Sequence, residues 1–564
     1  MSEQAARDEL LHQARTWVGE DPDPRTRDEL TAWVDRAVEG DEAAWLELAD
    51  RFAGFLEFGT AGLRGALGGG PNRMNRAVVI RTAAGLTAYL QQQLGLAGRQ
   101  DGPVVVVGFD ARHNSDVFAR DTAAVVTAAG GRALVLPRPL PTPVLAFAIQ
   151  HLGADAGVMV TASHNPPQDN GYKVYLGDGS QIVPPADVEI AAQMARIRSV
   201  TKVPLAAEGW QTLGEEVLDA YLDAAVAVLD PNSSRELSVV HTALHGVGAE
   251  VVEQAFERAG FTRPEQVAEQ AQPDPAFPTV AFPNPEEPGA IDAALALAEQ
   301  VQPDLVIAND PDADRCALAV RDGDGWRMLR GDEVGALLGH HVITRGLPST
   351  ARPVLARSIV SSRLLGTMAQ AAGLRGEETL TGFKWIGRVP GLAYGYEEAL
   401  GYCVDPGTVP DKDGVTAALL AAELAATLKT QGRTLTDVLD DLAVAHGLHQ
   451  TDAFSVRVSD LTLIPPVMAR LREQTPSELG GVQVGRVDDL ALGEGGLPPT
   501  EGIRFFLADG TRVIVRPSGT EPKLKVYLEA IVPVAAADQL VQARAEAARR
   551  LAAVRSSMEG LTAV

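Results

Sequence analysis

The chain has 564 residues, of which 46% are hydrophobic and 22% charged, which is typical of a globular protein too long for one hydrophobic core. Its formal net charge of −25 argues against nucleic-acid or anionic-membrane binding, although a local group of cations could still bind a small anion. The sequence has no apolar run of transmembrane length and no secretory leader, and its two cysteines, Cys316 and Cys403, suit neither a disulfide framework nor a zinc site, so we expect a cytoplasmic protein of several domains.

The first half of the chain predicts helices followed by an α/β domain. Residues 1–50 are polar and acidic with helical spacing, and predict an N-terminal extension of two or three helices. From residue 76 onward, helical and strand patterns alternate. The predicted helices are 76–94, 116–129 and 143–151, and the predicted strands are 103–108, 132–136 and 156–160. Such alternation is typical of a mostly parallel sheet with right-handed crossovers.

The alternation continues after a linker near 203–208 and then stops. Further strands are predicted at 237–242, 305–308 and 354–357, with helices at 332–345 and 362–372. After that, alternating residues at 454–458 and 523–528, a hairpin at 503–515 and a long helix at 536–553 indicate an antiparallel α+β domain.

We therefore predict an α/β fold of three consecutive α/β mixed-sheet domains plus a C-terminal α+β domain, around a central cleft. The predicted boundaries are 1–50 for the helical extension, then 51–208, 209–325, 326–450 and 451–564.

A sharp turn follows the buried strand at 156–160. Pro166 and Pro167 prevent the strand from continuing, and the turn places the Ser163 hydroxyl at the carboxyl end of a strand, where open α/β sheets keep their sites. Taken alone, Ser163 could equally be an ordinary turn former.

Three aspartates follow the strand at 305–308. Asp310, Asp312 and Asp314 stand at alternate positions, and oxygen-rich groups of this kind suit a hard cation such as Mg²⁺. A solvated acidic turn is the alternative. An EF-hand is disfavoured because its glycine and distal glutamate are missing.

Other polar segments could bind a phosphate or a sugar. Glycines surround Arg64 at 58–65, and glycine-rich backbone can approach a phosphate closely. Residues 395–402 offer carboxylates for sugar hydroxyls, with Lys384 and Lys412 as nearby cations. Residues 516–523 combine hydroxyls, a glycine and two cations, which can form an anion nest but not a Walker A loop.

Taken together, these segments make the chain resemble the α-D-phosphohexomutase family from about residue 58 to the end. Residues 161–166 are similar to the phosphoserine loop, 310–315 to the magnesium loop, 395–401 to the sugar-specificity loop and 516–520 to the phosphate-binding loop. Residues 58–65 and 382–387 indicate the branch of bacterial phosphoglucomutases and animal phosphopentomutases. One departure is Ala399, where family members usually carry serine, which leaves hexose or pentose preference open.

The resemblance implies a reversible interconversion of glucose 1-phosphate and glucose 6-phosphate through glucose 1,6-bisphosphate, which also serves as activator. Ser163 would carry the phosphoryl group, and one Mg²⁺ would be held by Asp310, Asp312, Asp314 and phosphorylated Ser163. Arg64 would hold the transferring phosphate and Lys173 would act as the base, with His164 as its rival. The implied substrate-binding residues are Thr60, Arg315, Thr381, Gly382, Lys384, Glu397, Ala399, Lys412, Arg516, Ser518, Gly519, Thr520 and Lys523.

Several alternatives remain at this stage. A phosphopentomutase or a phosphomannomutase would use the same mechanism. A phosphoenzyme phosphatase is suggested only by the Asp-x-Asp spacing of Asp310 and Asp312, and would leave the Ser163 turn unexplained. A non-catalytic metabolite-binding protein is a further alternative. We expect a monomer or homodimer whose only partner is a small sugar phosphate.

Overall fold

The computed structural model describes residues 3–59, 62–99, 101–347, 353–458, 460–518 and 523–563. The chain divides into two compact units. The first comprises Met1–Arg327 and Asp405–Ala422, and the second comprises Met328–Val404 and Glu423–Val564. A short segment of chain thus belongs to the first unit although the residues on both sides of it belong to the second.

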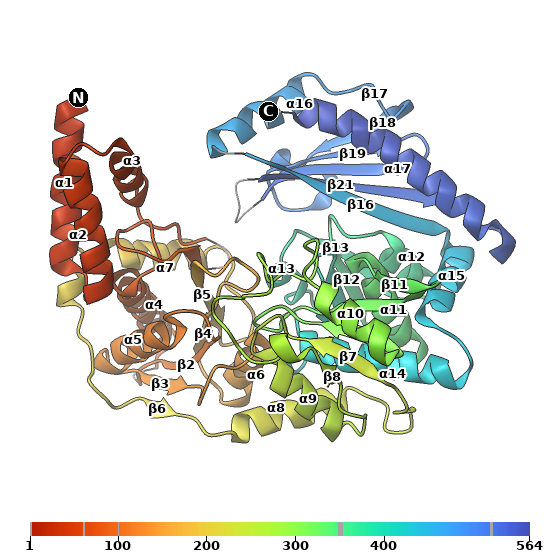
Figure 1. Ribbon diagram of the computed structural model, residues 1–564, viewed down its shortest axis with the longest axis horizontal. Coiled ribbons are helices and arrows are strands. Elements are labelled where there is room, and N and C mark those ends of the chain that lie inside the picture. The colour runs from red at the N-terminus through yellow and green to blue at the C-terminus, as the bar shows by residue number, and fades with distance from the viewer. Residues whose placement is uncertain are drawn as a thin grey trace. The chain divides into compact units, whose positions relative to one another are not determined.

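The N-terminal residues form a helical bundle, as predicted (Figure 1, red). Its helices are α1 (Glu3–Glu20), α2 (Pro24–Val38) and α3 (Glu42–Arg51). The side chains of Asp23 and Asp41 cap the N-termini of α2 and α3, accepting hydrogen bonds from the first backbone N–H groups of those helices. Leu30 and Leu48 are fully buried between the helices.

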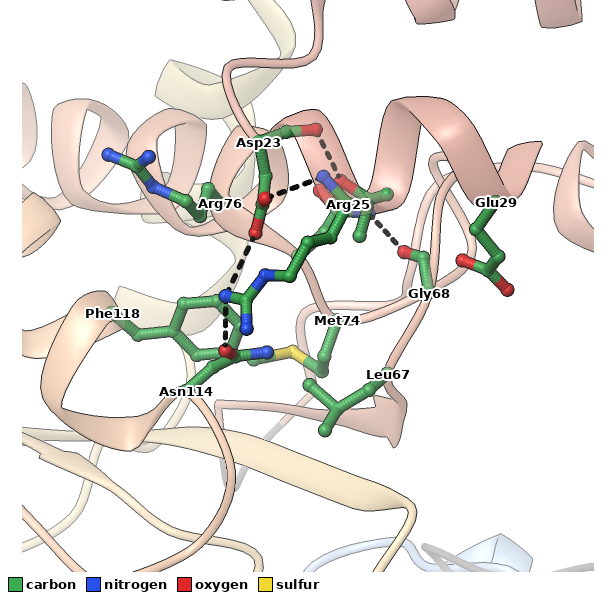
Figure 2. A pocket seen from close by; sticks show the side chains of 11 residues that line it. Asp23, Arg25, Glu29, Leu67, Gly68, Met74, Arg76, Asn114 and Phe118 are labelled. Carbon is green, nitrogen blue, oxygen red and sulfur yellow. Dashed lines mark hydrogen bonds and ion pairs between the residues drawn. The ribbon is translucent and has the colours of Figure 1, made fainter. Parts of the chain in front are cut away.

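A polar cavity of about 300 Å³ lies where α2 meets the first α/β domain (Figure 2). The Arg25 guanidinium lies between the Asp23 carboxylate, 3.4 Å away, and Asn114 Oδ1, 3.0 Å away. Arg76, also on the wall, makes a two-pronged ion pair with Asp121. The charged groups on the wall therefore already have partners. The contact between Arg25 and Asn114 joins the helical extension to the sheet domain.

The first sheet has the strand order β1-β5-β4-β2-β3-β6. Its parallel part contains β2 (Val104–Phe109), β3 (Arg132–Val135), β4 (Ala156–Val160) and β6 (Gln211–Thr212). Two antiparallel strands complete it, β5 (Asp169–Leu176) and β1 (Leu63–Ala66). The helices of this domain are α4 (Arg76–Leu96), α5 (Ser115–Ala128), α6 (Thr142–His151) and α7 (Ala186–Ala195). The predicted parallel arrangement is correct for β2, β3 and β4, whereas β5 and β1 were not predicted.

The second and third sheets repeat this plan of a parallel centre and an antiparallel edge. The second contains β7 (Val239–Thr242), β8 (Glu265–Gln266), β9 (Leu305–Ala308), β10 (Ala317–Asp322) and β11 (Gly325–Met328), with α8 (Glu216–Ala227), α9 (Gly248–Arg258) and α10 (Asp292–Val301). The third contains β12 (Val354–Ser358), β13 (Arg375–Thr379), β14 (Leu392–Glu397) and β15 (Gly401–Cys403). Its helices are α11 (Gly331–Thr344), α12 (Leu364–Ala371), α13 (Phe383–Ile386), α14 (Gly414–Thr430) and α15 (Leu435–His446).

The C-terminal domain is an antiparallel sheet of order β16-β21-β20-β19-β18-β17. Its strands are β16 (Leu448–Arg457), β17 (Glu478–Leu479), β18 (Val482–Asp489), β19 (Ile503–Leu507), β20 (Arg512–Pro517) and β21 (Lys523–Val532), and its helices are α16 (Ile464–Glu473) and α17 (Leu540–Thr562). Helix α17 packs along β16 and β21 (Figure 1). The predicted mixed α/β and α+β fold is therefore confirmed, while the central cleft and the domain boundaries stay predictions.

Among the described residues, each helix is too short or too polar to cross a membrane.

Candidate active site

Ser163 lies in the turn between β4 and β5, in a backbone conformation that few residues other than glycine adopt. Its φ is 52°, in the left-handed region, which costs an ordinary residue roughly 1–3 kcal/mol. The Ser163 backbone N–H donates to Thr161 Oγ1 at 2.9 Å, and the side-chain hydroxyl donates to Asp310 Oδ2 at 2.8 Å. The turn therefore directs the buried Ser163 hydroxyl toward the acidic loop that follows β9.

The three aspartates of that loop form one buried cluster. Asp310, Asp312 and Asp314 are at most 1% exposed, and one carboxylate oxygen of each lies within 4.8 Å of the others. Burial, and then the charges of Asp312 and Asp314, raise the pKa of Asp310 well above its usual value. Asp312 Oδ1 and Asp314 Oδ1 have no hydrogen-bond partner among the described residues. Buried, mutually repelling carboxylates with unpartnered oxygens are a donor set that a metal cation would satisfy.

Lysines from two other parts of the first unit meet this cluster. Lys173 Nζ lies 2.7 Å from Asp312 Oδ2 and 2.9 Å from Asp314 Oδ2, and Lys412 Nζ lies 3.4 Å from Asp314 Oδ2. Burial acts to lower the pKa of Lys173, but the two carboxylates raise it above its usual value. Lys173 is therefore a charged hydrogen-bond donor here, and its role as a base stays a prediction that these ion pairs oppose.

His164 is neutral and touches the Ser163 hydroxyl. Burial, and then the positive charges of Arg315 and Arg64, lower the pKa of His164 well below its usual value. Its Nδ1 lies 3.1 Å from Ser163 Oγ. Because the single hydroxyl proton of Ser163 is donated to Asp310, we assign the proton on the ring to Nδ1, which then donates to Ser163 Oγ.

The two predicted arginines of the first unit also border the Ser163 turn and the cluster. Arg64, on β1, donates from Nη1 to Asn165 Oδ1 at 3.0 Å. Arg315 Nε lies 3.9 Å from Asp310 Oδ2 and 3.8 Å from Asp314 Oδ1. The structure thus brings Ser163, His164, Lys173, Arg64, Arg315, Lys412 and the three aspartates together within the first unit.

The sequence did not reveal which residues hold the turn that carries Lys412. Tyr175 Oη donates to Asp411 Oδ2 at 3.0 Å, and Tyr221 Oη donates to Asp413 Oδ1 at 2.9 Å. Gly414 N donates to Ala313 O at 3.1 Å, and a side chain at Gly414 would collide with the backbone of the acidic loop. The sequence indicated only that Lys412 could be a nearby cation, because the partners of the Asp-Lys-Asp-Gly run are distant in sequence.

Thr142 was missed as well. It begins α6, and its hydroxyl donates to Asp312 Oδ2 at 2.6 Å while its N–H donates to Asp312 O at 2.9 Å. Thr142 lies within the proline-rich stretch at 137–143, and nothing local indicated that it would contact an aspartate 170 positions later.

Most of the remaining predicted residues belong to the second unit. Glu397 is the last residue of β14, and Lys384 lies in α13, which begins directly after Gly382. Arg516 lies in β20, which pairs with β21, and Lys523 is the first residue of β21. Predicted residues that occupy loops here are Thr381, Ala399 and Ser518. Thr60, Gly519 and Thr520 lie outside the described residues.

The neighbouring glutamate of the sugar-loop motif has a local structural partner. Glu398 Oε2 accepts hydrogen bonds of 3.1 Å from both Ser358 and Ser361. The Glu398 carboxylate is therefore bound by two serines of the third α/β domain.

The chain matches four family models in order. They are the phosphoglucomutase/phosphomannomutase alpha/beta/alpha domains I, II and III, at residues 56–201, 219–323 and 330–445, and the C-terminal domain, at 464–547.

Similar proteins carry several mutase names. A "Probable phosphomannomutase" of Haemophilus influenzae is 47% identical over 81% of this chain and 93% of its own length. A phosphopentomutase of Homo sapiens is 36% identical over 86% of this chain and 87% of its own length. A phosphoglucomutase of Staphylococcus epidermidis is 34% identical over 84% of this chain and 90% of its own length.

A crystal structure of a phosphoglucomutase/phosphomannomutase family protein from Burkholderia thailandensis has the same fold. Its TM-score is 0.67 at 19% identity, covering 89% of this chain and 97% of that one.

Proposed function

The chain belongs to the phosphoglucomutase/phosphomannomutase family and is therefore a mutase enzyme, and within that family we propose that it interconverts glucose 1-phosphate and glucose 6-phosphate. The observation that carries the proposal is the hydrogen bond from Ser163 Oγ to a buried acidic cluster that retains unpartnered oxygens. This arrangement joins a phosphoryl carrier to a cation site, which is what phosphoryl transfer requires.

Asp310, Asp312 and Asp314 fit Mg²⁺, because they offer buried oxygen ligands whose mutual repulsion a cation would relieve. Bound Mg²⁺ would supply neutralisation of the charge on the transferring phosphoryl group. The proposed ligand set is completed by an oxygen of phosphorylated Ser163.

The residues of the chain would divide the reaction between them. The bond between phosphorus and Ser163 Oγ breaks as a sugar hydroxyl attacks, and the neutral His164 can donate a hydrogen bond to the departing Oγ. Arg64 would hold the phosphate. Lys173 is the proposed acceptor of the sugar hydroxyl proton, on the condition that its pKa falls when Asp312 and Asp314 are engaged otherwise.

A bisphosphate intermediate must bind in two orientations if either phosphate is to return to Ser163. We assign Glu397 to the sugar hydroxyls in both orientations, and Arg516 and Ser518 to the phosphate that is not reacting. Under this assignment, Arg516→Ala chiefly raises KM for the sugar phosphate, and an unchanged KM would remove Arg516 from the binding site.

The test is a coupled assay of glucose 1-phosphate turnover with Mg²⁺ and a trace of glucose 1,6-bisphosphate, beside ribose 1-phosphate and mannose 1-phosphate. Preference for glucose supports the proposal. Preference for ribose or mannose would keep the mechanism and indicate instead a phosphopentomutase or a phosphomannomutase, the names that the human and Haemophilus relatives carry.

Ser163→Ala tests the carrier itself. We expect an intact fold and a loss of turnover of about 10³-fold or more, because no covalent route remains. Near-normal turnover of this variant would exclude Ser163 as the carrier.

A further inference from the structure

One buried arginine holds the backbone of the Ser163 turn. Arg112 Nη2 donates to the carbonyl oxygens of Ser163 at 2.7 Å and Asn165 at 2.5 Å, and Nη1 donates to those of Pro166 at 2.9 Å and Asp169 at 3.1 Å. The planar guanidinium thus binds four carbonyls of one turn, which a point charge such as an ammonium cannot do.

An aspartate from the same loop after β2 fixes the turn from the other side. Asp110 Oδ2 accepts a hydrogen bond of 2.7 Å from Thr161 Oγ1, and Thr161 Oγ1 in turn accepts from Ser163 N. Asp110 Oδ1 accepts from Arg112 N at 3.0 Å and from Ser115 Oγ at 2.7 Å. The Thr161 hydroxyl donates in one direction and accepts in the other, so only a hydroxyl can complete this relay.

These contacts surround the one strained residue of the turn. Ser163 has a φ of 52°, and a residue stays in that region only where its surroundings over-determine it. The Arg112 side chain is 1% exposed and its guanidinium lies 4.9 Å from the centre of the Phe277 ring. Asp110, Arg112 and Thr161 are thus all buried.

We propose that Asp110, Arg112 and Thr161 are positioning residues that hold Ser163 in its left-handed conformation and thereby direct Oγ at the Asp310–Asp312–Asp314 cluster. This inference rests on the proposed role of Ser163 as phosphoryl carrier. None of the three residues contacts the cluster directly in the hydrogen bonds given above. Loosening the turn should slow phosphoryl transfer without weakening the binding of sugar phosphate or cation.

The decisive pair of variants is Thr161→Val and Thr161→Ser. Valine keeps the shape and removes the relay, whereas serine keeps the hydroxyl. We expect Thr161→Val to lower kcat about 100-fold, with KM for the sugar phosphate within about twofold of the parent, because small misplacement of a reacting atom acts on the transfer step. Thr161→Ser should recover kcat to within about fivefold.

A second readout does not depend on turnover. Dephosphorylated protein is mixed with glucose 1,6-bisphosphate, and phosphorylation of Ser163 is followed by intact-protein mass spectrometry. The rate for Thr161→Val should fall by the same factor as kcat, while the Mg²⁺-induced rise in melting temperature stays unchanged.

Arg112→Lys and Arg51→Met separate positioning from general destabilisation. Both parent side chains are buried, at 1% and 5% exposure, and Arg51 donates to Gly69 O in the helical extension. Arg112→Lys should lower kcat of the folded protein about 100-fold, because one ammonium cannot span four carbonyls. Arg51→Met should lower the melting temperature and leave kcat of the folded fraction unchanged.

The inference is overturned if folded Thr161→Val and parent share the same kcat and phosphorylation rate, or if Thr161→Ser fails to recover them. The Thr161 pair decides even if Arg112→Lys does not fold. Failure of the proposed function is a different result: the parent protein itself would turn over no sugar phosphate and would not be phosphorylated at Ser163.

Discussion

Each compact unit contains a buried cluster of charged side chains, but the two clusters differ in how their oxygens are used. In the first unit, Asp310, Asp312 and Asp314 repel one another and two of their oxygens have no hydrogen-bond partner among the described residues. Two lysines approach the cluster without saturating it.

In the second unit, one carboxylate is saturated. Glu529 Oε1 accepts from Ser362 Oγ, Arg363 N and His449 Nδ1, and Oε2 accepts from Arg363 Nε and lies 3.3 Å from Arg512 Nη2. Burial acts to raise the pKa of Glu529, but Arg512, His449 and Arg363 lower it well below its usual value.

The comparison teaches that burial of charge alone does not mark a site. An excess of acceptors over donors indicates room for an absent cation, whereas a balanced set indicates structure.

Asp310→Asn should have the largest effect, a fall in kcat of about 10⁴-fold, because a cation ligand and the partner of Ser163 are lost. The free energy of unfolding, measured with urea at pH 7 without Mg²⁺, should not decrease, because the substitution removes one of three mutually repelling buried carboxylates and keeps an oxygen that can accept from Ser163. A clear loss of stability would contradict the comparison.

Glu529→Gln should have the opposite profile. Arg363 and Arg512 would keep their buried charges without a full counter-charge, so the free energy of unfolding should fall by about 3–5 kcal/mol. Urea denaturation measures this loss, and Glu546→Gln in α17, which removes a half-buried carboxylate paired with the exposed Arg549, serves as the control that should change little.

Asp413 offers an intermediate case, because its carboxylate accepts hydrogen bonds from neutral groups: the Tyr221 hydroxyl and the backbone N–H groups of Val415 and Thr416. Burial raises its pKa from 3.8 to about 6. Between these values the folded protein binds more protons than the unfolded chain, so stability should fall by about 3 kcal/mol as pH rises from about 4 to above 6. Asp413→Asn should remove this part of the pH dependence in urea titrations at pH 4.5 and 7.5, and an unchanged profile would refute it.

Mg²⁺ should stabilise only proteins with an intact acidic cluster. At a concentration 100 times its Kd, it should add about 2.7 kcal/mol to the free energy of unfolding of the parent and of Glu529→Gln, and nothing to that of Asp310→Asn. Thermal melts across a Mg²⁺ titration provide the measurement, and equal shifts in all three proteins would place the cation elsewhere.

Local patterns predicted the strands that carry the site. The apolar runs before Ser163 and Asp310 formed β4 and β9, and both residues follow a strand end as expected. The strand β5 was missed because it begins Asp-Asn-Gly, residues that favour turns, and forms only through its pairing with β4 and β1. That pairing sets Lys173 opposite Met159, close to the turn.

The supports of the site could not be predicted from the sequence. Arg112 follows the strand predicted at 103–108, Thr142 directly precedes the helix predicted at 143–151, and neither was predicted to support the site. Their partners lie 51 and 170 positions away, respectively, and no periodicity encodes such long-range pairs. Hydrophobic spacing predicts which face of an element is buried, but not which distant polar group will meet it.

The short segment Asp405–Ala422 makes the order of synthesis matter for the first unit. The acidic loop is complete in the nascent chain when Asp314 emerges. Lys412, and the carboxylates that accept hydrogen bonds from the Tyr175 and Tyr221 hydroxyls, emerge about 100 residues later, which takes about 5–20 s at ordinary rates of translation. A fragment ending at Arg327 would permanently lack those partners. The first unit therefore cannot be isolated by a single cut, and its folding can finish only after most of the third α/β domain has been made.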